Sequence, residues 1–297
     1  MGESRKAQRR REWVIEKLLF ACAIGSVLTM IAILGVLLID AIGFFGEVSI
    51  VEFFTETRWT PLFSDKHFGV LPLVWGTLMV TAIALAVAVP LGLASAIFLS
   101  EYAPEKLRRT VKPILEVLAG IPTVVYGYFA LTFVTPLLQM LFPGMLVFNA
   151  LSAGLVMGIM IIPLISSLSE DSMVAVPQSF REGAYALGAQ RHEVAIKIVF
   201  PSALSGIVAS IILAISRAIG ETMIVSIAAG GTPYIGLNPL VSIQTLTGYI
   251  TQVALGEAAV GSIEFKTIFA VGLTLFLMTL VVNLIGQYIA KRYWKRY

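Results

Sequence analysis

Two charged residues, Arg217 and Glu221, stand four positions apart within an apolar stretch, and they are the only charges in the middle of any such stretch. A charge at the centre of a bilayer costs at least about 2.5–3.5 kcal/mol on insertion scales, so ionisable residues there are functional candidates by default. On one continuous helix, positions four apart share a face. The spacing therefore predicts a buried Arg–Glu ion pair inside a membrane helix.

The chemistry of this pair suits an anionic solute. The guanidinium of Arg217 offers five N–H donors in a planar fork that matches the oxygens of a tetrahedral oxyanion. Glu221 would neutralise the arginine while a pathway is empty, or repel anions until the pathway opens. We expect both residues to line a substrate pathway. The alternatives are a structural ion pair that fixes helix packing, and an arginine that pairs with a partner subunit.

The composition places the chain in a membrane. Of its 297 residues, 58% are hydrophobic and 13% are charged, whereas soluble domains carry about 25% charged residues. A membrane-spanning helix needs about 20 mostly apolar residues. Six segments meet that requirement: 18–41, 71–99, 114–141, 147–168, 202–229 and 267–290. The third and fourth are separated at Phe142-Pro143-Gly144, where turn-forming residues interrupt a charge-free run.

Lysine and arginine set the expected orientation, because they gather on the cytoplasmic side of membrane proteins. They collect before the first segment, between the second and third, between the fourth and fifth, and after the sixth. This alternation predicts cytoplasmic basic tails at 1–17 and 291–297, a six-helix domain at 18–290 and a cytoplasmic loop at 169–201. The expected fold class is an all-α integral protein of the cytoplasmic membrane, with both termini cytoplasmic.

Glycine and proline mark further features. Gly154 and Gly158 form a G-x-x-x-G pair, which lets another helix approach closely. The run Gly120-Ile121-Pro122-Thr123 interrupts the third segment and could turn backbone N–H groups towards an anion. The weakly apolar stretch 243–255 is too polar to span, so we expect it at the outer surface or partway into the membrane. Such helix breakers also occur in membrane helices without any function.

The sequence lacks motifs for catalysis. A P-loop requires G-x-x-x-x-G-K-[ST], but the pair Gly256 and Gly261 is followed by Ser262 where lysine should stand. The two histidines, His67 and His192, are too far apart in sequence to suggest a metal site. We therefore expect a non-enzymatic transport subunit without cofactor or metal. If the protein uses ATP, a separate ATPase would have to bind it together with Mg²⁺.

A polar, helix-prone run precedes the fifth segment. In it, Glu182-Gly183-Ala184 is followed by Gly188 and, nine residues on, by Ile198-Val199-Phe200-Pro201. The pattern resembles the cytoplasmic signature of ABC-importer permeases, which is E-A-A, three residues, glycine, nine residues and I-x-L-P. Gly183 and Phe200 are mild departures from it. The physical sense is a short helix, a glycine turn and a second helix ended by proline.

This resemblance implies a fold like that of type I ABC importer permeases, in which the loop 169–201 is a rigid knob that sits in a cleft of an ATPase. An ordinary amphipathic cytoplasmic loop is the alternative. The residues that the resemblance assigns to ATPase coupling are Glu182, Gly183, Ala184, Gly188, Ile198 and Pro201.

Three further stretches resemble the PstC type of phosphate-importer permease: 68–104, 120–127 and 216–222. The resemblance implies ATP-driven import of inorganic phosphate and a role in transport for Arg217 and Glu221. It also implies four kinds of partner: a second homologous permease of the PstA type, two cytoplasmic ATPase subunits, an extracytoplasmic phosphate-binding protein and the lipid bilayer. No nucleic acid is expected.

Other functions fit the same residues. The cargo could be another oxyanion, such as sulfate or molybdate, or an organic solute, because an Arg–Glu pair alone does not distinguish these. The chain could also be a non-transporting sensor or scaffold subunit in the membrane. A stand-alone channel conflicts with the docking signature.

Overall fold

The computed structural model describes residues 2–294, and the side chains of 2–8, 257 and 291–294 lie outside this description. The predicted tail at 291–297 therefore lies outside the described side chains. All regular elements of the described chain are helices, apart from one isolated bridge between Trp59 and Phe68, and irregular loops connect them. Residues 2–17 of the predicted tail at 1–17 are continuous with the first long helix.

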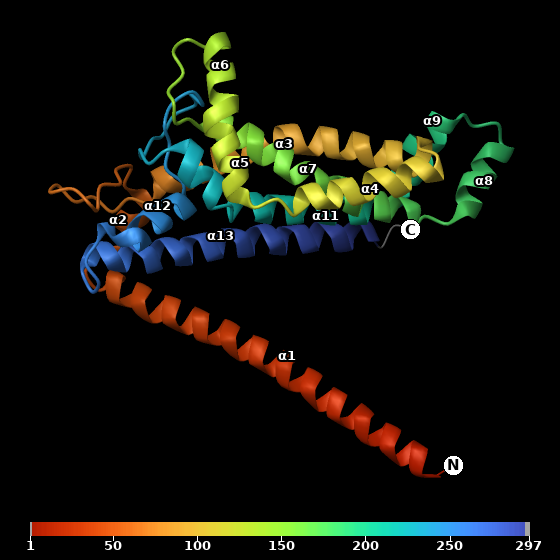
Figure 1. Cartoon of the computed structure of the whole chain (residues 1–297). Helices are drawn as coiled ribbons and strands as arrows, with labels where there is room; N and C mark the ends of the chain where they lie inside the picture. The colour runs from red at the N-terminus through yellow and green to blue at the C-terminus, as the bar shows by residue number, and fades with distance from the viewer. Residues whose placement is uncertain (1, 295–297) are drawn as a thin grey trace.

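Four helices run side by side and form the body of the molecule (Figure 1). They are α3 (Leu71–Ile97), α7 (Ala150–Val174), α11 (Leu204–Ile219) and α13 (Ile263–Trp294). α3 and α7 pack most closely, and the two glycines predicted to admit a helix make this possible. A Cβ added to Gly154 would lie 2.7 Å from Ile83 Cβ, and one added to Gly158 would lie 2.8 Å from the Ala84 carbonyl. Close approach at this pair is confirmed, and α3 is the helix that approaches.

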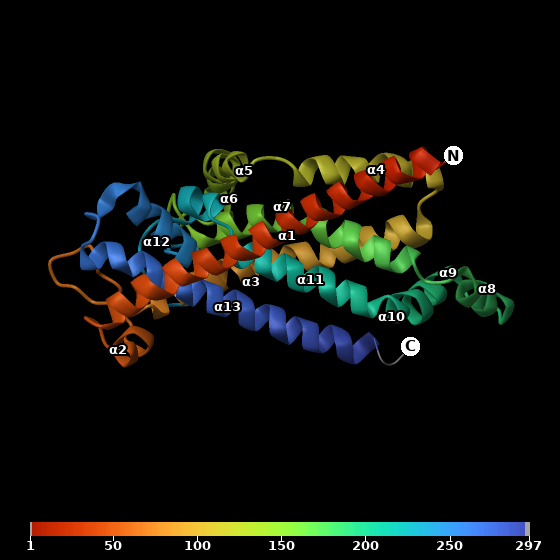
Figure 2. The same cartoon turned by 90° about the horizontal axis from the view of Figure 1, so that it is seen from below.

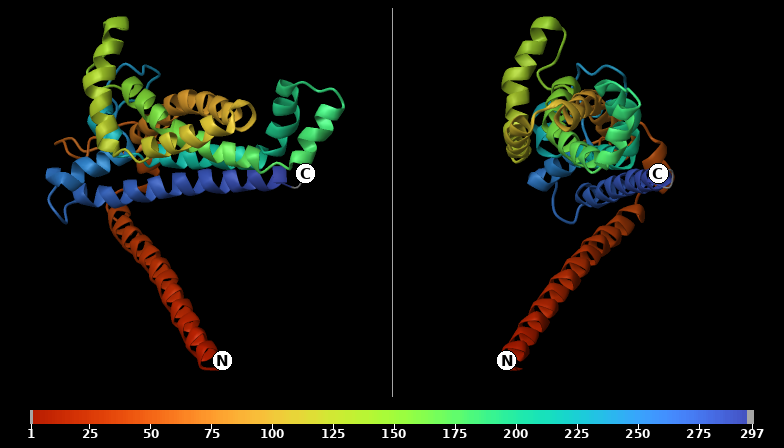
Figure 3. Two further views of the ribbon diagram at one scale, coloured as in Figure 1. Left: turned by 45° about the vertical axis from the view of Figure 1, so that its right-hand side comes forward. Right: turned by 90° about the vertical axis from the view of Figure 1, so that its right-hand side faces the viewer.

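The helix α1 (Gly2–Phe45) leaves the bundle at an angle (Figures 1 and 3). Only its last turns pack, where Ala41 and Phe44 are buried, and its most apolar window has no residue buried within this chain. Because a surface this apolar is unstable in water, lipid or another subunit must cover it.

One end of the bundle carries the short helix α2 (Ile50–Thr55) together with α12 (Leu246–Gln252) and the π-helical turn η5 (Val253–Glu257). We call this the α12 end. The stretch 243–255, expected at the outer surface or partway into the membrane, packs into the protein, where Leu246 and Tyr249 are buried. Edge-to-face contacts between aromatic rings, including Trp59 against Tyr249 at 4.9 Å, join this helix to the neighbouring loop.

The opposite end, which we call the α8 end, carries the long polar loop. Its elements are α8 (Gln178–Ala186), α9 (Arg191–Glu193), the π-helical turn η3 (Val194–Val199), α10 (Phe200–Ser202) and the π-helical turn η1 (Phe98–Tyr102) that follows α3. The first turns of α1 and the last turns of α13 point towards this end (Figure 2). The first described residues of α1 and the last of α13 thus lie towards the same end of the bundle.

The predicted third span, 114–141, is wrong as one helix. α4 (Glu105–Ala119) ends before Gly120, and the chain resumes in a second helical stretch after Pro122. That stretch comprises α5 (Thr123–Phe129), the π-helical turn η2 (Ala130–Val134) and α6 (Thr135–Leu141), and it turns away from the direction of the bundle (Figure 1). The break has a local cause, because proline lacks the N–H that a continuing helix needs.

The predicted fifth span, 202–229, is also wrong as one continuous helix. α11 meets α10 at a 70° bend and ends at Ile219, and Gly220 follows in a turn. A second short helical stretch then ends in the π-helical turn η4 (Val225–Ala229). Among the described residues, five helices are long and apolar enough to cross a membrane, or six if the bent pair counts as one span. The predicted break at 142–144 is confirmed, since α6 ends at Leu141.

Candidate functional site

Glu221 sits at the break after α11, where it caps the next helical stretch. Its carboxylate accepts hydrogen bonds from the backbone N–H groups of Met223, at 3.1 Å, and Ile224, at 3.2 Å. The first N–H groups of a helix have no partner within the helix, so a carboxylate there accepts their hydrogen bonds. Its negative charge also interacts favourably with the helix dipole. The side chain is buried, with 7% of the residue exposed.

The predicted ion pair between Arg217 and Glu221 is not formed among the described residues. The prediction required one continuous helix through both positions, but α11 ends at Ile219 and Gly220 changes the chain direction. Arg217 stays on α11 and is exposed on the surface of this chain. The two residues are neighbours at one break, with separate local roles.

Arg217 lies halfway along the bundle. One of its terminal nitrogens is 4.0 Å from the sulfur of Met160, which stands near the middle of α7. Tyr126 packs against the core cluster that contains Met160, and its hydroxyl donates to the Leu118 carbonyl at 3.0 Å across the break between α4 and α5. A guanidinium at this depth is costly in contact with lipid. The face of α11 that carries Arg217 must therefore border a polar pathway or another subunit.

A pocket of about 330 Å³ opens beside the same break, on the side of the α12 end. Its polar lining is neutral, with Ser226, Gln244, Thr251 and Gln252 among the lining residues. Gln244 donates to the Gln252 side chain at 2.6 Å, and Thr247 of α12 donates to the Glu221 carbonyl, also at 2.6 Å. Hydroxyl and amide groups of this kind hydrogen-bond an oxyanion without holding it as tightly as a cation would.

The predicted coupling residues divide between a surface and a core. Glu182 and Gly183 lie exposed on α8, and Gly188 takes the positive φ of 82° that ends this helix. Ala184 and Ile198 pack against buried residues of the bundle, which include Met173. Pro201 lies in α10, within the bend that leads into α11. The result is a projecting loop with an apolar base, whose tip residue Leu187 is 90% exposed.

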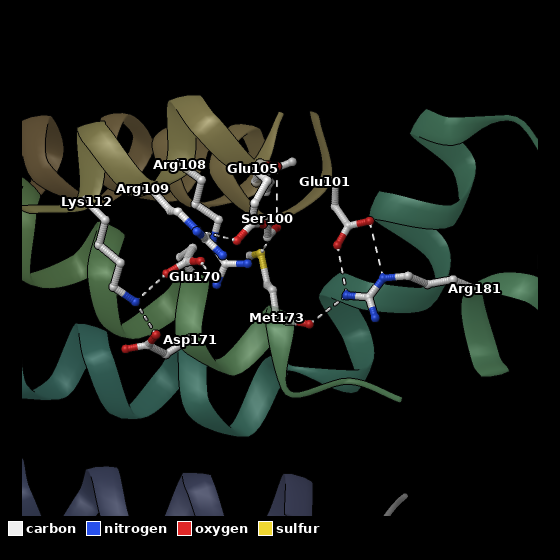
Figure 4. Close-up of polar contacts among 11 residues, drawn as sticks. Ser100, Glu101, Glu105, Arg108, Arg109, Lys112, Glu170, Asp171, Met173 and Arg181 are labelled. Carbon is white, nitrogen blue, oxygen red and sulfur yellow. Dashed lines mark hydrogen bonds and ion pairs between the residues drawn. The ribbon is translucent and has the colours of Figure 1, made fainter. Parts of the chain in front are cut away.

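An ion pair that the sequence analysis missed fixes this loop to the bundle. Arg181 of α8 donates to the carboxylate of Glu101 in η1 at 3.0 Å, and to the carbonyls of Met173 and Val176 at 2.8 and 2.6 Å (Figure 4). The two side chains are 11% and 5% exposed. Arg191 of α9 donates to the Glu101 carbonyl at 2.8 Å. The end of α3, the end of α7 and the loop thus form one hydrogen-bonded unit.

A second missed carboxylate, Glu170 of α7, is completely buried and fixes α4. It pairs with Arg108 at 2.6 Å and Lys112 at 2.8 Å, and Lys112 also pairs with Asp171 (Figure 4). Arg108 and Lys112 are four positions apart and share one face of α4. Their spacing, opposite a carboxylate that directly follows a charge-free run, is the sequence signal that could have revealed this contact.

At the α12 end, His67 bridges two carboxylates in the loop before α3. One ring nitrogen contacts Glu56, and the other lies 3.2 Å from Asp65. The hydrogen bond to Glu56, followed by that to Asp65, raises the pKa of the His67 imidazole above its ordinary value of 6.5. No group of three or more potential metal ligands occurs among the described residues.

Comparison with known proteins identifies the family. Residues 88–295 match the family described as binding-protein-dependent transport system inner membrane component. This chain belongs to that family. Its members are transport permease subunits in a membrane. The expected all-α membrane fold and the resemblance to ABC-importer permeases are confirmed, while the orientation of the termini stays a prediction.

Similar proteins match along most of this chain. A probable ABC transporter permease protein, YqgH of Bacillus subtilis, is 35% identical, with 92% of this chain and 88% of that protein covered. The phosphate transport system permease proteins PstC of Mesorhizobium japonicum and Haemophilus influenzae are 32% and 31% identical. They cover 97% and 93% of this chain, and 94% and 92% of their own lengths.

Solved structures support the fold. A bacterial ABC transporter that imports the polysaccharide alginate aligns with a TM-score of 0.64 at 16% identity, covering 95% of this chain and 96% of that one. The MetNI methionine ABC transporter aligns with a TM-score of 0.58 at 19% identity, covering 75% and 95%. At such low sequence identity, these matches support the arrangement of the helices and nothing about function.

Proposed function

We propose that this chain is the PstC-type permease subunit of an ATP-driven importer that carries inorganic phosphate across the cytoplasmic membrane. The observation that carries the proposal is the exposed guanidinium of Arg217 halfway along a membrane bundle. A cation at that depth attracts an anion into the pathway, and its fork suits phosphate oxygens. The similarity to PstC proteins supports phosphate as the anion.

The proposed orientation puts the α8 end in the cytoplasm. Arg181, Arg191, Lys112 and Arg108 gather at this end, and cytoplasmic loops carry an excess of such residues. Both termini would then be cytoplasmic, because the first turns of α1 and the last turns of α13 lie towards the α8 end. A binding protein would deliver phosphate at the α12 end.

The subunit needs partners to complete the pathway. A second homologous permease of the PstA type would face Arg217 and enclose the anion between the two chains. Two ATPase subunits would bind ATP with Mg²⁺ and dock on α8 around Glu182 and Gly188. This chain would bind no cofactor itself, and it would contact the lipid bilayer rather than nucleic acid.

Movement at the ATPase would reach the pathway through rigid contacts. When the ATPases close, they would push α8. Arg181 would pass this movement to η1 through Glu101 and to the end of α7 through the Met173 carbonyl. The bend at α10 would pass it to α11, which carries Arg217. The site would then face each side in turn. Phosphate must bind weakly enough to leave, as in channels.

The test is uptake of radiolabelled phosphate by proteoliposomes with the full transporter, with ATP hydrolysis recorded alongside. We expect Arg217→Gln to lower uptake about tenfold or more, because it removes a charge-assisted contact to the anion. Arg217→Lys keeps the charge but loses the planar fork, so its uptake rate should lie between those of the wild type and Arg217→Gln. Arg109→Gln is the matched control, since Arg109 is exposed and pairs only with Glu105 of its own helix among the described residues.

Glu221→Gln tests the second pathway residue. The amide keeps an oxygen for the backbone N–H groups of Met223 and Ile224, so this variant removes the charge while it preserves the cap. If both Arg217→Gln and Glu221→Gln transport normally, the two residues serve packing alone. Uptake of sulfate in preference to phosphate would keep the importer and change the cargo. Normal uptake with altered phosphate-dependent signalling would instead favour a sensor subunit.

A further inference from the structure

A second polar pocket, of about 520 Å³, lies at the α8 end, far from Arg217 along the bundle. It is formed where η1, α4, the end of α7, α8 and α9 meet. Its lining comprises Ser100, Glu101, Arg108, Val174, Gln178, Arg181, Tyr185 and Arg191. Nothing in the transport pathway proposed above uses this pocket.

The charges that line this pocket favour an anion. Three guanidiniums, from Arg108, Arg181 and Arg191, line it together with one carboxylate, Glu101. Because Arg108 also pairs with the buried Glu170 at 2.6 Å, these three arginines and their two carboxylates leave one net positive charge. The carboxylate is already engaged, because it accepts from Arg181 at 3.0 Å. Like charges that converge on one cavity repel each other, and an oxyanion relieves that repulsion.

The arginines are held in place rather than free to swing into solvent. Arg191 donates its Nε–H to the Glu101 carbonyl, and its guanidinium lies 5.1 Å from the centre of the Tyr102 ring. Arg108 is anchored by the buried Glu170 at 2.6 Å. Guanidiniums fixed in advance lose little conformational freedom when a ligand binds. The neutral groups Gln178 and Ser100 add hydrogen-bonding capacity on the same lining.

We propose that this pocket binds inorganic phosphate on the cytoplasmic side and thereby slows further import. The choice of phosphate and of the cytoplasmic side rests on the proposed function, while the pocket itself does not. A bound tetrahedral oxyanion bridges arginines of α4, α8 and α9. α8 and α9 belong to the loop that an ATPase would push, whereas α4 lies outside that loop.

The regulatory effect follows from where the ligand binds. An anion that binds better when α8, α9 and α4 lie as they do here stabilises this arrangement over any arrangement that separates the arginines. Each import cycle requires the loop to move, so occupancy opposes the cycle. Rising internal phosphate then reduces its own import, with the permease subunit as sensor.

The first experiment measures binding without transport. The full transporter, with its partner permease and ATPases but without the binding protein, is placed in nanodiscs and dialysed against radiolabelled phosphate. Arg191→Gln should raise the Kd of the wild-type site about tenfold, because one charge-assisted contact is lost. Arg191→Lys should give a smaller increase. Lys197→Gln removes one charge from the same loop outside the pocket, where Lys197 pairs with Glu193, and should bind as wild type does.

Copurification of all subunits confirms that each variant assembles. The Arg217→Gln variant separates this site from the transport pathway: it should lose uptake but retain binding that depends on Arg191. Binding that disappears with Arg217 instead would overturn the proposal.

The second experiment measures the consequence. Proteoliposomes are loaded with phosphate, sulfate or chloride, and the initial rate of uptake is recorded for wild type, Arg191→Gln and Lys197→Gln. Internal phosphate should slow the wild type and the Lys197→Gln control, and Arg191→Gln should resist this inhibition. Equal inhibition by sulfate would broaden the ligand to tetrahedral oxyanions in general and keep the site.

Two further results would overturn the proposal. One is that phosphate is taken up normally from outside, while internal phosphate neither binds to the pocket nor slows uptake. This result would contradict the internal site and leave the proposed function unaffected. The other is that phosphate binds to the permease separated from its ATPases but not to the full transporter. In that case the ATPase occupies the pocket with an acidic side chain of its own. Sulfate uptake without phosphate uptake would contradict the proposed cargo, and the binding measurement would still judge the site.

Discussion

The carboxylate of Glu101 and the guanidinium of Arg181 lie 3.0 Å apart although 80 positions separate them in the sequence. Glu101 stands at the end of α3 and Arg181 on α8, so this contact joins a membrane helix to the loop expected to meet the ATPase. Both side chains are nearly buried. Removal of one partner therefore leaves the other as an uncompensated charge.

Glu101→Gln should uncouple ATP hydrolysis from transport. The buried arginine loses its charged partner, which costs about 3–5 kcal/mol for a buried pair, and the loop loses its fixed orientation relative to α3. We expect a lower melting temperature and less phosphate taken up per ATP hydrolysed, measured in the same proteoliposomes. Glu193→Gln, on the exposed part of the same loop, should change neither. An unchanged ratio of uptake to hydrolysis would show that the pair stabilises without coupling.

Glu170→Ala should release α4 from the bundle. Arg108 and Lys112 both pair with this fully buried carboxylate, so its loss leaves two cations without their main partner. We expect easier proteolysis of α4 and a melting temperature lowered by several degrees. Asp171→Asn is the neighbouring control, because its side chain is 56% exposed and its contact with Lys112 is a surface pair. Equal effects of the two substitutions would contradict the central role of Glu170.

Gly154→Val should separate α3 from α7. A side chain there meets Ile83, whose Cβ would lie 2.7 Å away, and overpacking of this kind costs about 1–3 kcal/mol or more. The expected result is a large loss of folded, assembled permease in size-exclusion chromatography. Gly25→Val supplies the control, since no atom lies within 4 Å of a Cβ at Gly25 of α1. Normal yield from both would mean that α3 and α7 can move apart without cost.

The loop around His67 should be more stable at low pH. Hydrogen bonds to Glu56 and then Asp65 raise the folded pKa of the imidazole above 6.5. The protonated form is thus favoured in the folded state, so its stabilising contribution is complete below pH 6.5 and is lost as the pH rises through the raised pKa. Thermal unfolding of the wild type between pH 5.5 and 8.5 should show this loss. His67→Gln should remove that part of the pH dependence, and an unchanged profile would contradict the role of the histidine.

The sequence by itself determined the membrane class, the helical fold and the place of the polar loop at the α8 end. Apolar length fixes which segments can enter a bilayer, since every backbone group in lipid must be hydrogen-bonded within a helix. The glycine and proline positions likewise marked Gly188 as a turn and 142–144 as a break. These features depend on neighbours along the chain, so local patterns suffice to predict them.

The tertiary structure alone decided which charges meet. Spacing placed Arg217 beside Glu221, but Gly220 turns the chain between them, and Glu221 caps a new helix instead. Glu101 finds Arg181, and Glu170 finds α4, across long sequence separations. A buried charge takes whichever partner folding brings within reach, because leaving it unpaired costs more than any local preference contributes. The identity of that partner therefore depends on how the helices pack.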